Sequence, residues 1–365
     1  MDEIELVIEH VLGSLQKRVE ACDGGFDLDT DDIMLRAAHD FIFSCFYKQY
    51  NRINYDAKED EHTGVLHRAV NSSMNPLVPY SILLKVLEPI PKYFAAIFME
   101  YGRMKAKIFR FVEDQLALSL RARKEVARAK REGFKIDPEV IKLSDGKVYR
   151  RNMIDPFVDN YFEGKISRTE YMNSSMNLYL AGTKTLADAL SRTLYYLASH
   201  TSVQDKLRES IMEHGIDSEY LTWCINEVLR LEPPVTFGCS RTVEREYEVE
   251  GGAVPKGTFV LTHAYTIHRL PEYWGEDANQ FKPERWQHAD KFHPTQYIAF
   301  GLGSRGCPGK EFALIVTRKL MVSLLTRYKF ERSSKTSDAN LYRSFLYIFL
   351  IFEFPTYVKV TKLQM

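Results

Sequence analysis

The sequence predicts an α+β fold that is mostly helical, and two observations support this prediction. Through the first 232 residues, apolar side chains recur at three- and four-residue spacing, as they do along one face of an α-helix. Beyond that point, short β-prone runs alternate with glycine and proline, which is typical of a small sheet. We therefore expect a single domain over residues 1–365, with a mainly helical part over 1–232 and the sheet within 233–365.

The composition is that of an ordinary soluble-type domain. Of the 365 residues, 45% are hydrophobic and 27% are charged, and the formal net charge of +0 argues against a nucleic-acid partner. No run reaches the ~18 consecutive apolar residues of a membrane-spanning helix, and the acidic, amphipathic start is not typical of a signal peptide. Five irregularly spaced cysteines favour a reducing compartment over a disulfide framework; they are Cys22, Cys45, Cys224, Cys239 and Cys307.

Three early stretches have helical periodicity. They cover residues 2–21, 30–50 and 91–132. The third is long and its second half is basic, which favours a solvated helix face, with a docking surface for an acidic partner as the alternative.

Two further features complete the helical part. Pro89 and Pro91 indicate a helix break within the apolar region 79–100, which is the one part of this chain expected to be able to touch a membrane. A second long helix is predicted over about 167–199. It is largely apolar, which is typical of a helix that crosses the core.

The second part of the chain has the texture of strands and turns. Residues 245–265, "REYEVEGGAVPKGTFVLTHAY", predict a small sheet. Residues 341–362 predict a closing hairpin, because their apolar run is too short to span a bilayer.

A single cysteine lies in the glycine-rich stretch "FGLGSRGCPGK", residues 300–310. Glycines at this density indicate positive φ angles or a close approach to a flat group. Pro308 suits a first helical position, and the next residues have helical periodicity. Cys307 is therefore expected at a helix N-terminus, where free N–H groups and the helix dipole favour a thiolate.

Several uses of such a cysteine compete. A structural zinc site needs about four nitrogen or sulfur ligands, and the nearest upstream cysteine, Cys239, is far away in sequence. A nucleophilic cysteine needs a histidine base, which folding could bring near. A single axial thiolate to a haem iron needs one cysteine and glycines that let the porphyrin approach. The last alternative is an ordinary buried cysteine in a tight turn.

The stretch resembles the haem-binding signature of the cytochrome P-450 family, F-x-x-G-x-R-x-C-x-G, at every fixed position. The resemblance implies the family's α+β fold, a haem b cofactor and Cys307 as the axial ligand of the haem iron. Phe300, Gly301 and Gly309 would then contact the cofactor. Arg305 and Arg241 match positions that bind the haem propionates.

Glu227 and Arg230 lie three residues apart on a predicted helix and can pair, although such a pair alone is a weak signal. The segment "FKPERW" follows, with Arg285. The resemblance implies that these three residues form a buried network that fixes the cysteine loop. Their expected role is structural rather than catalytic.

Residues 181–186, "AGTKTL", resemble the family's motif on the helix above the haem. The resemblance implies that Gly182 permits a local opening of this helix and that Thr185 hydrogen-bonds dioxygen. Lys184 and Leu186 depart from the pattern, since they replace an acid and a hydroxyl residue.

The resemblance covers nearly the whole chain. We expect that the family's N-terminal helices, first sheet strands and membrane anchor have no counterpart in these residues. It implies a monooxygenase that takes electrons from NADPH through a separate flavoprotein reductase and acts with O2 on a small lipophilic substrate. Lys310, Arg318 and Lys319 would lie on the reductase side. Full-length relatives are typically bound to the endoplasmic reticulum, and the compartment of this chain is left open.

The chain looks most similar to fungal members, some of which hydroxylate fatty acids. Two other functions stay open. The first is a haem-thiolate enzyme that rearranges peroxides without a reductase, which Lys184 favours. The second is a truncated, non-catalytic haem-binding remnant.

Overall fold

The computed structural model divides into two compact units, Met1–Ser14 with Leu35–Lys184 and Leu15–Met34 with Thr185–Met365, which are described in turn. The single domain predicted from the sequence stays a prediction. For residues 91–108, 343–346 and 349–352 only the backbone is described. The described residues are 3–22, 25–48, 55, 91–135, 137, 139–238, 241–336, 343–346, 349–352 and 356–363.

Three helices contribute residues to both units: α1 (Glu3–Glu20), α2 (Thr30–Phe41) and α7 (Arg168–Ser199). The helices predicted over 2–21 and 167–199 are confirmed. The prediction for 30–50 was wrong in one respect, because α2 ends at Phe41 and continues as a π-helix, η1 (Ile42–Phe46). All five residues of η1 are buried, and Ser44 is the polar one among them.

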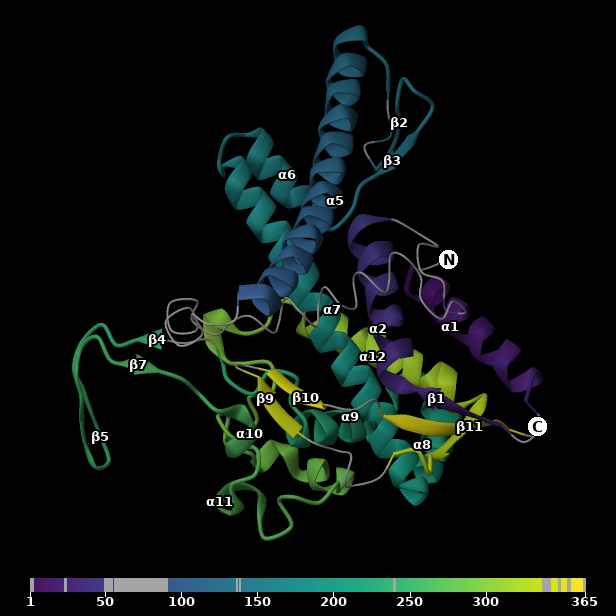
Figure 1. Ribbon diagram of the computed structural model, residues 1–365, viewed down its shortest axis with the longest axis vertical. Helices are drawn as coiled ribbons and strands as arrows, with labels where there is room; N and C mark the ends of the chain where they lie inside the picture. Colours follow the sequence, from purple (N-terminus) through teal and green to yellow (C-terminus); the bar gives the residue numbers. More distant parts are fainter. Residues whose placement is uncertain are drawn as a thin grey trace. The chain divides into compact units, whose positions relative to one another are not determined.

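The first unit contains the long helix α5 (Pro91–Glu132), which confirms the helix predicted over 91–132. A hairpin of β2 (Val140–Lys142) and β3 (Val148–Arg150) packs against it, as does α6 (Asp155–Phe162) (Figure 1). The contact between α5 and the hairpin is an apolar cluster of Ala122, Ile141, Leu143 and Tyr149.

A charged cluster joins α5 to α6 in the same unit. Nη2 of Arg123 donates to carboxylate oxygens of Asp155 at 2.9 Å and of Asp159 at 2.6 Å. The hydroxyl of Ser119 donates to Asp155 at 2.7 Å. Because Asp155 is buried, these bonds offset the cost of removing its charge from water.

The second unit contains the C-terminal part of α7 and three further helices, α8 (Thr201–His214), α9 (Glu219–Leu231) and α12 (Lys310–Leu325). The helices α8, α9 and α12 contact one another. The 3₁₀ turn η2 (Gly215–Asp217) connects α8 to α9. The hydroxyl of Ser218 caps α9 by accepting the amide of Leu221 at 3.1 Å.

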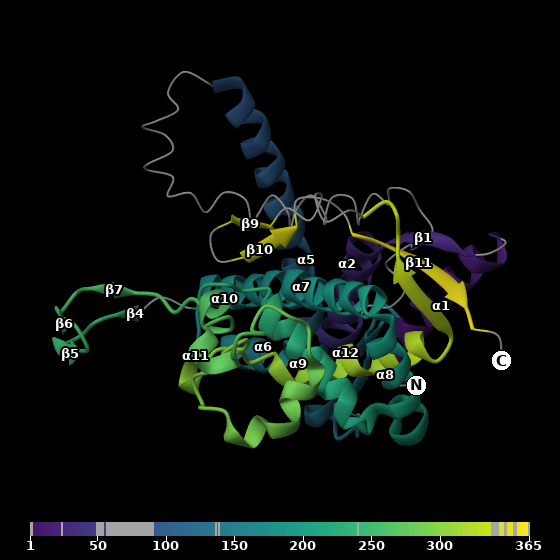
Figure 2. The same ribbon diagram turned by 90° about the horizontal axis from the view of Figure 1, so that it is seen from below.

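The unit also holds a three-stranded antiparallel sheet with the order β1 (Phe26–Asp29), β11 (Tyr357–Lys362), β8 (Tyr328–Arg332). Figure 2 shows β1 next to β11. Val358 and Val360 on β11 are fully buried, as alternation along a strand requires. The closing hairpin predicted over 341–362 is partly wrong. Strands β9 (Arg343–Leu346) and β10 (Phe349–Phe352) form a hairpin, whereas β11 joins the other sheet.

The small sheet predicted over 245–265 is confirmed as two short antiparallel pairs. β4 (Arg241–Thr242) pairs with β7 (Phe259–Val260), and β5 (Tyr247–Val249) pairs with β6 (Gly252–Val254). In both views this ribbon extends from the helices of its unit (Figures 1 and 2).

Short turns lead from the ribbon to α12. They are α10 (Ala264–Ile267), α11 (Pro271–Trp274), η3 (Pro283–Lys291) and η4 (Gly303–Arg305). Pro91 begins α5, whereas Pro89 and the apolar residues 79–90 lie outside the described residues, as does Cys239. Within the described ranges, none of the helices is long and apolar enough to cross a bilayer.

Candidate functional site

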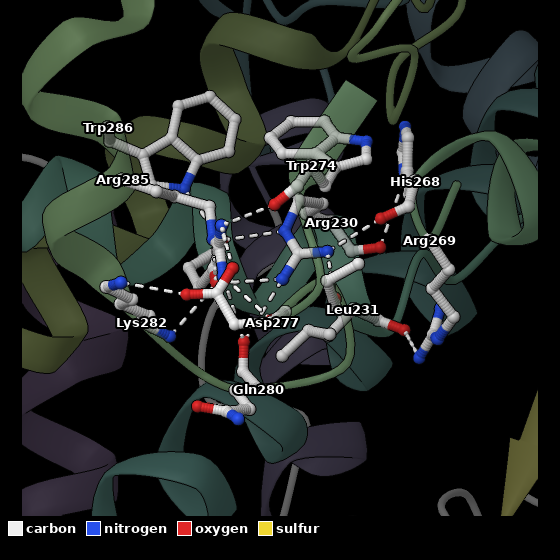
Figure 3. A network of polar contacts seen from close by, with 12 residues as sticks. Arg230, Leu231, His268, Arg269, Trp274, Asp277, Gln280, Lys282, Arg285 and Trp286 are labelled. Carbon is white, nitrogen blue, oxygen red and sulfur yellow. Dashed lines mark hydrogen bonds and ion pairs between the residues drawn. The ribbon is translucent and has the colours of Figure 1, made fainter. Parts of the chain in front are cut away.

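Glu227 is a buried residue of α9, and its carboxylate is the centre of a dense set of hydrogen bonds. Figure 3 labels four residues that donate to it, namely Arg230, Lys282, Arg285 and Trp286. Oε2 accepts from Arg230 Nε at 2.8 Å and from the Trp286 indole at 3.0 Å. Oε1 accepts from Arg230 Nη2 at 2.8 Å, Arg285 Nε at 2.7 Å and the Lys282 amide at 3.0 Å. A fully buried carboxylate therefore has five donors, three of which belong to the two cationic side chains of Arg230 and Arg285.

The Arg230 guanidinium is also fully buried and uses its remaining N–H groups on backbone carbonyls. Nη1 donates to the carbonyls of His268 and Ala278, both at 2.6 Å, and Nη2 donates to that of Gln280 at 3.2 Å. The guanidinium carbon lies 4.9 Å from the ring centroid of Trp274. Arg230 thus fastens α9 to the chain segment between α10 and η3.

Arg285 completes the network from η3. Its Nη1 donates to the Trp274 carbonyl and to Asp277 Oδ1, each at 3.2 Å, and Nη2 donates to the Asp277 carbonyl at 3.1 Å. The pKa of Asp277 is lowered, chiefly by a hydrogen bond from Lys282 and further by the charge of Arg285.

The structure therefore brings together the three residues singled out from the sequence, Glu227, Arg230 and Arg285. With side chains 0%, 0% and 9% exposed, they are not a surface pair, and breaking such a buried network is expected to be costly. Their role in holding the cysteine loop stays a prediction.

His268 also belongs to this region, and nothing in the sequence pointed to it. Its ring contacts the backbone at Arg230 and at Ile298, which lie 38 and 30 residues away in the chain. Burial lowers the pKa of His268 to about 3, so the ring is neutral. The stretch "IHRLPEYW" around it has no local pattern that separates it from any other buried histidine.

The cysteine loop is shaped by tight backbone turns. The Cys307 amide donates to the Phe300 carbonyl at 2.7 Å, and the Gly306 amide donates to the Gly303 carbonyl at 3.0 Å. Gly301 and Gly303 have φ angles of +69° and +67°, which only glycine adopts readily.

Cys307 itself is exposed. The helix α12 begins at Lys310 with Gly309 as its N-cap, so Pro308 precedes the cap and is not the first helical residue as predicted. Cys307 therefore lies three residues before the first residue of the helix, and its carbonyl accepts the Lys310 amide at 3.4 Å.

The residues present fit a single thiolate ligand to a haem. A Cβ on Gly309 would lie 3.8 Å from Cys307 Sγ, so the glycine leaves space next to the sulfur. Among the described residues, no three His, Cys, Asp or Glu side chains gather in a way that suits zinc. Phe300 is half-buried at the start of the loop.

Two arginines were predicted to bind the haem propionates. Arg305 is exposed on η4, two residues before Cys307. Arg241 is exposed on β4, which pairs with β7. Both assignments to the propionates stay predictions.

On α7, the motif residues Gly182, Lys184 and Thr185 are half-buried. The helix is continuous from Arg168 to Ser199, so it is not opened at Gly182 here. A Cβ at Gly182 would lie 2.8 Å from Cδ1 of Ile42, which explains the glycine by close packing against η1. The roles predicted for the three residues toward dioxygen remain untested.

The comparisons with known proteins agree on one family. The family model described as Cytochrome P-450 matches residues 1–359. Cytochrome P-450 3A5 of Homo sapiens is 31% identical over 213 residues, which cover 53% of this chain and 42% of that protein. In Caenorhabditis elegans, cytochrome P-450 CYP13A5 is 35% identical over 169 residues (43% and 32%), and CYP13A2 is 28% identical over 271 residues (70% and 53%).

These matches span about a third to a half of the length of the relatives. The relatives are from a nematode and a mammal, and others come from pig and mouse. The predicted likeness to fungal members therefore gains no support.

Proposed function

Because the chain belongs to the cytochrome P-450 family, we propose that it acts as a haem-thiolate monooxygenase on a small lipophilic substrate. The observation that carries this proposal is the exposed Cys307 in a glycine-rich turn. The turn follows η3 in the chain, and the buried Glu227 network binds η3 through Arg285. In the proposed reaction, one atom of O2 enters a C–H bond, and the other leaves as water after two electrons and two protons are taken up.

When bound, the haem supplies the oxygen chemistry, and a thiolate ligand favours O–O cleavage. The Cys307 thiolate would hold the iron, and Arg305 and Arg241 would bind the propionates. Glu227, Arg230 and Arg285 would keep the loop segment in place without touching the reacting atoms.

Electrons would come from NADPH through a separate flavoprotein reductase. Lys310 is exposed at the start of α12, whereas Arg318 and Lys319 are half-buried. Arg318 lines a shallow pocket of about 500 Å³ together with Asp217, Glu219 and Asp290, so this face has mixed charge. Lys310 is therefore the best placed of the three cations for an acidic reductase surface.

Isotope labelling tests the proposed function. The haem-loaded full chain, supplied with NADPH, a flavoprotein reductase and ¹⁸O2, is expected to place one labelled oxygen in a lipophilic compound. A panel of fatty acids and other apolar compounds would be analysed by mass spectrometry. Conversion of an organic hydroperoxide without reductase, and no label from ¹⁸O2, would favour the peroxide-rearranging alternative. A loaded protein inactive in both assays would favour the non-catalytic remnant.

Lys184 is expected to weaken the coupling of electron uptake to product. Each turnover needs two protons, and an ammonium can donate hydrogen bonds but cannot accept them, unlike the acid usual at this position. Since general acid–base help contributes roughly 10²–10⁴-fold, much of the NADPH should end as hydrogen peroxide. Lys184→Asp should raise the ratio of product to peroxide several-fold.

A matched control for this variant is Lys165→Asp, which makes the same charge change at an exposed lysine before α7. It should leave the ratio unchanged. Tight coupling in the wild type, or equal ratios in both variants, would contradict the proton-delivery argument.

A further inference from the structure

His268 links the Glu227 network to the start of the cysteine loop. It is the C-cap residue of α10, and its side chain is fully buried. Nδ1 lies 3.0 Å from the Arg230 carbonyl oxygen, and Nε2 lies 2.9 Å from the Ile298 amide nitrogen. One imidazole ring therefore spans from the end of α9 to the segment that precedes Cys307.

The two backbone partners fix the protonation of the ring. A carbonyl only accepts and an amide N–H only donates, so Nδ1 must carry the proton and Nε2 must be bare. A protonated ring would place an N–H against the Ile298 N–H. The lowered pKa of His268 agrees with this single neutral tautomer.

The contact with Arg230 is reciprocal. The ring of His268 donates to the Arg230 carbonyl, while Nη1 of Arg230 donates to the His268 carbonyl at 2.6 Å. The ring also stacks on Tyr297, with centroids 5.3 Å apart, and Tyr297 packs edge-on against Trp286 at 4.7 Å. His268 thus contacts Arg230 directly and Trp286 through Tyr297, and both Arg230 and Trp286 donate to Glu227.

From Ile298 the backbone bonds continue into the loop. The Ile298 carbonyl accepts the Gly301 amide at 2.9 Å, and the Phe300 carbonyl accepts the Cys307 amide at 2.7 Å. A shift of Ile298 would therefore be passed to the backbone of Cys307 through two short turns.

We infer that His268 is a positioning residue for Cys307, acting through the Ile298 amide. The inference deepens the proposed function and rests on it for its spectroscopic readout. If His268 only stabilised the fold, losing either of its two hydrogen bonds should affect Cys307 equally. If it positions Cys307, losing the bond from the Ile298 amide to Nε2 should matter more than losing the bond from Nδ1 to Arg230.

Two amide side chains separate the halves of the ring. In His268→Gln, the amide group reaches about as far as Nε2, so its oxygen can still accept from Ile298. In His268→Asn, the amide group replaces Nδ1 and can still donate to Arg230, but it leaves the Ile298 amide without a partner. Gln204→Leu is the matched control, because Gln204 is also fully buried and bonds both the amide and the carbonyl of Phe330.

The experiment uses the haem-loaded full chain of each variant. Two quantities are measured, namely the rate at which the reduced, carbon monoxide-bound protein loses its thiolate-type Soret band, and the amide hydrogen exchange of residues 298–307. Losing a hydrogen bond to a buried amide should raise both rates about tenfold in His268→Asn. His268→Gln should stay near the wild type, and Gln204→Leu should lower the unfolding midpoint without changing either rate.

Equal effects of His268→Gln and His268→Asn, or effects that merely follow the loss of stability as in Gln204→Leu, would overturn the inference. If His268→Asn gives no folded protein, amide hydrogen exchange of the wild type, measured residue by residue, tests the inference. The amides of Ile298, Gly301 and Cys307 should then exchange through one common opening, with the same opening free energy. A different opening free energy for Ile298 would contradict the coupling of His268 to Cys307. A wild type without a thiolate spectrum would refute the proposed function instead, while the exchange data would still test His268.

Discussion

Replacing Glu227 with alanine is expected to leave little soluble, haem-loaded protein. The change removes the acceptor of five hydrogen bonds and leaves Arg230 and Arg285 without their common counter-charge. Breaking a buried ion pair in this way costs about 3–5 kcal/mol. Since domains are stable by only about 5–15 kcal/mol, the loss should be visible as aggregation and low haem content.

Soluble yield, haem absorbance and urea unfolding of any soluble fraction measure this effect. Glu132→Ala is the matched control, because Glu132 pairs with Arg128 on the exposed surface of α5 at 2.9 Å. It should change yield and stability little. A folded and haem-loaded Glu227→Ala protein of normal stability would contradict the role assigned to the network.

The second large effect concerns Cys307. Cys307→Ala should abolish the thiolate-type spectrum and all reductase-dependent turnover, because no other residue in the loop can supply a sulfur ligand. The fold should be retained, since the side chain is exposed and the loop is held by backbone bonds that alanine preserves. Circular dichroism and the unfolding midpoint of the haem-free protein check the second half of this prediction.

The matched control is Cys22→Ala, which removes another exposed cysteine, located just after α1. Its spectrum and turnover should equal those of the wild type. If Cys307→Ala retained the thiolate spectrum, the ligand would have to be sought elsewhere in the chain.

Much of the fold could be predicted because its signals are local. The apolar periodicity of 91–132 and 167–199 placed α5 and α7 to within a residue, since a helix that buries one face must repeat at three and four residues. The hairpin of β2 and β3 was missed although its turn, "SDGK", contains an Asp-Gly pair, and Gly146 has a φ of +84°.

Other parts could not be predicted because their causes are distant in the chain. Strand β1 has only four residues, "FDLD", and its partner β11 lies more than 300 residues later. The π-helix after Phe41, "IFSCF", has residues that could equally continue a buried α-helix.

The candidate site shows the same division. Spacing and family resemblance led to Glu227, Arg230, Arg285 and Cys307. The place of His268 depends on two backbone groups that only the folded chain brings to its ring. The periodicity of apolar residues can be read from a sequence. A hydrogen bond between a side chain and a backbone group 30 residues away leaves no such pattern.

The central claim is that Cys307 ligates a haem iron, and the spectrum of the wild type tests it most directly. The purified, haem-loaded protein would be reduced and exposed to carbon monoxide, with folding checked by circular dichroism. We predict the red-shifted Soret band of a thiolate-ligated haem. A histidine-type spectrum from folded, haem-loaded protein would contradict the account.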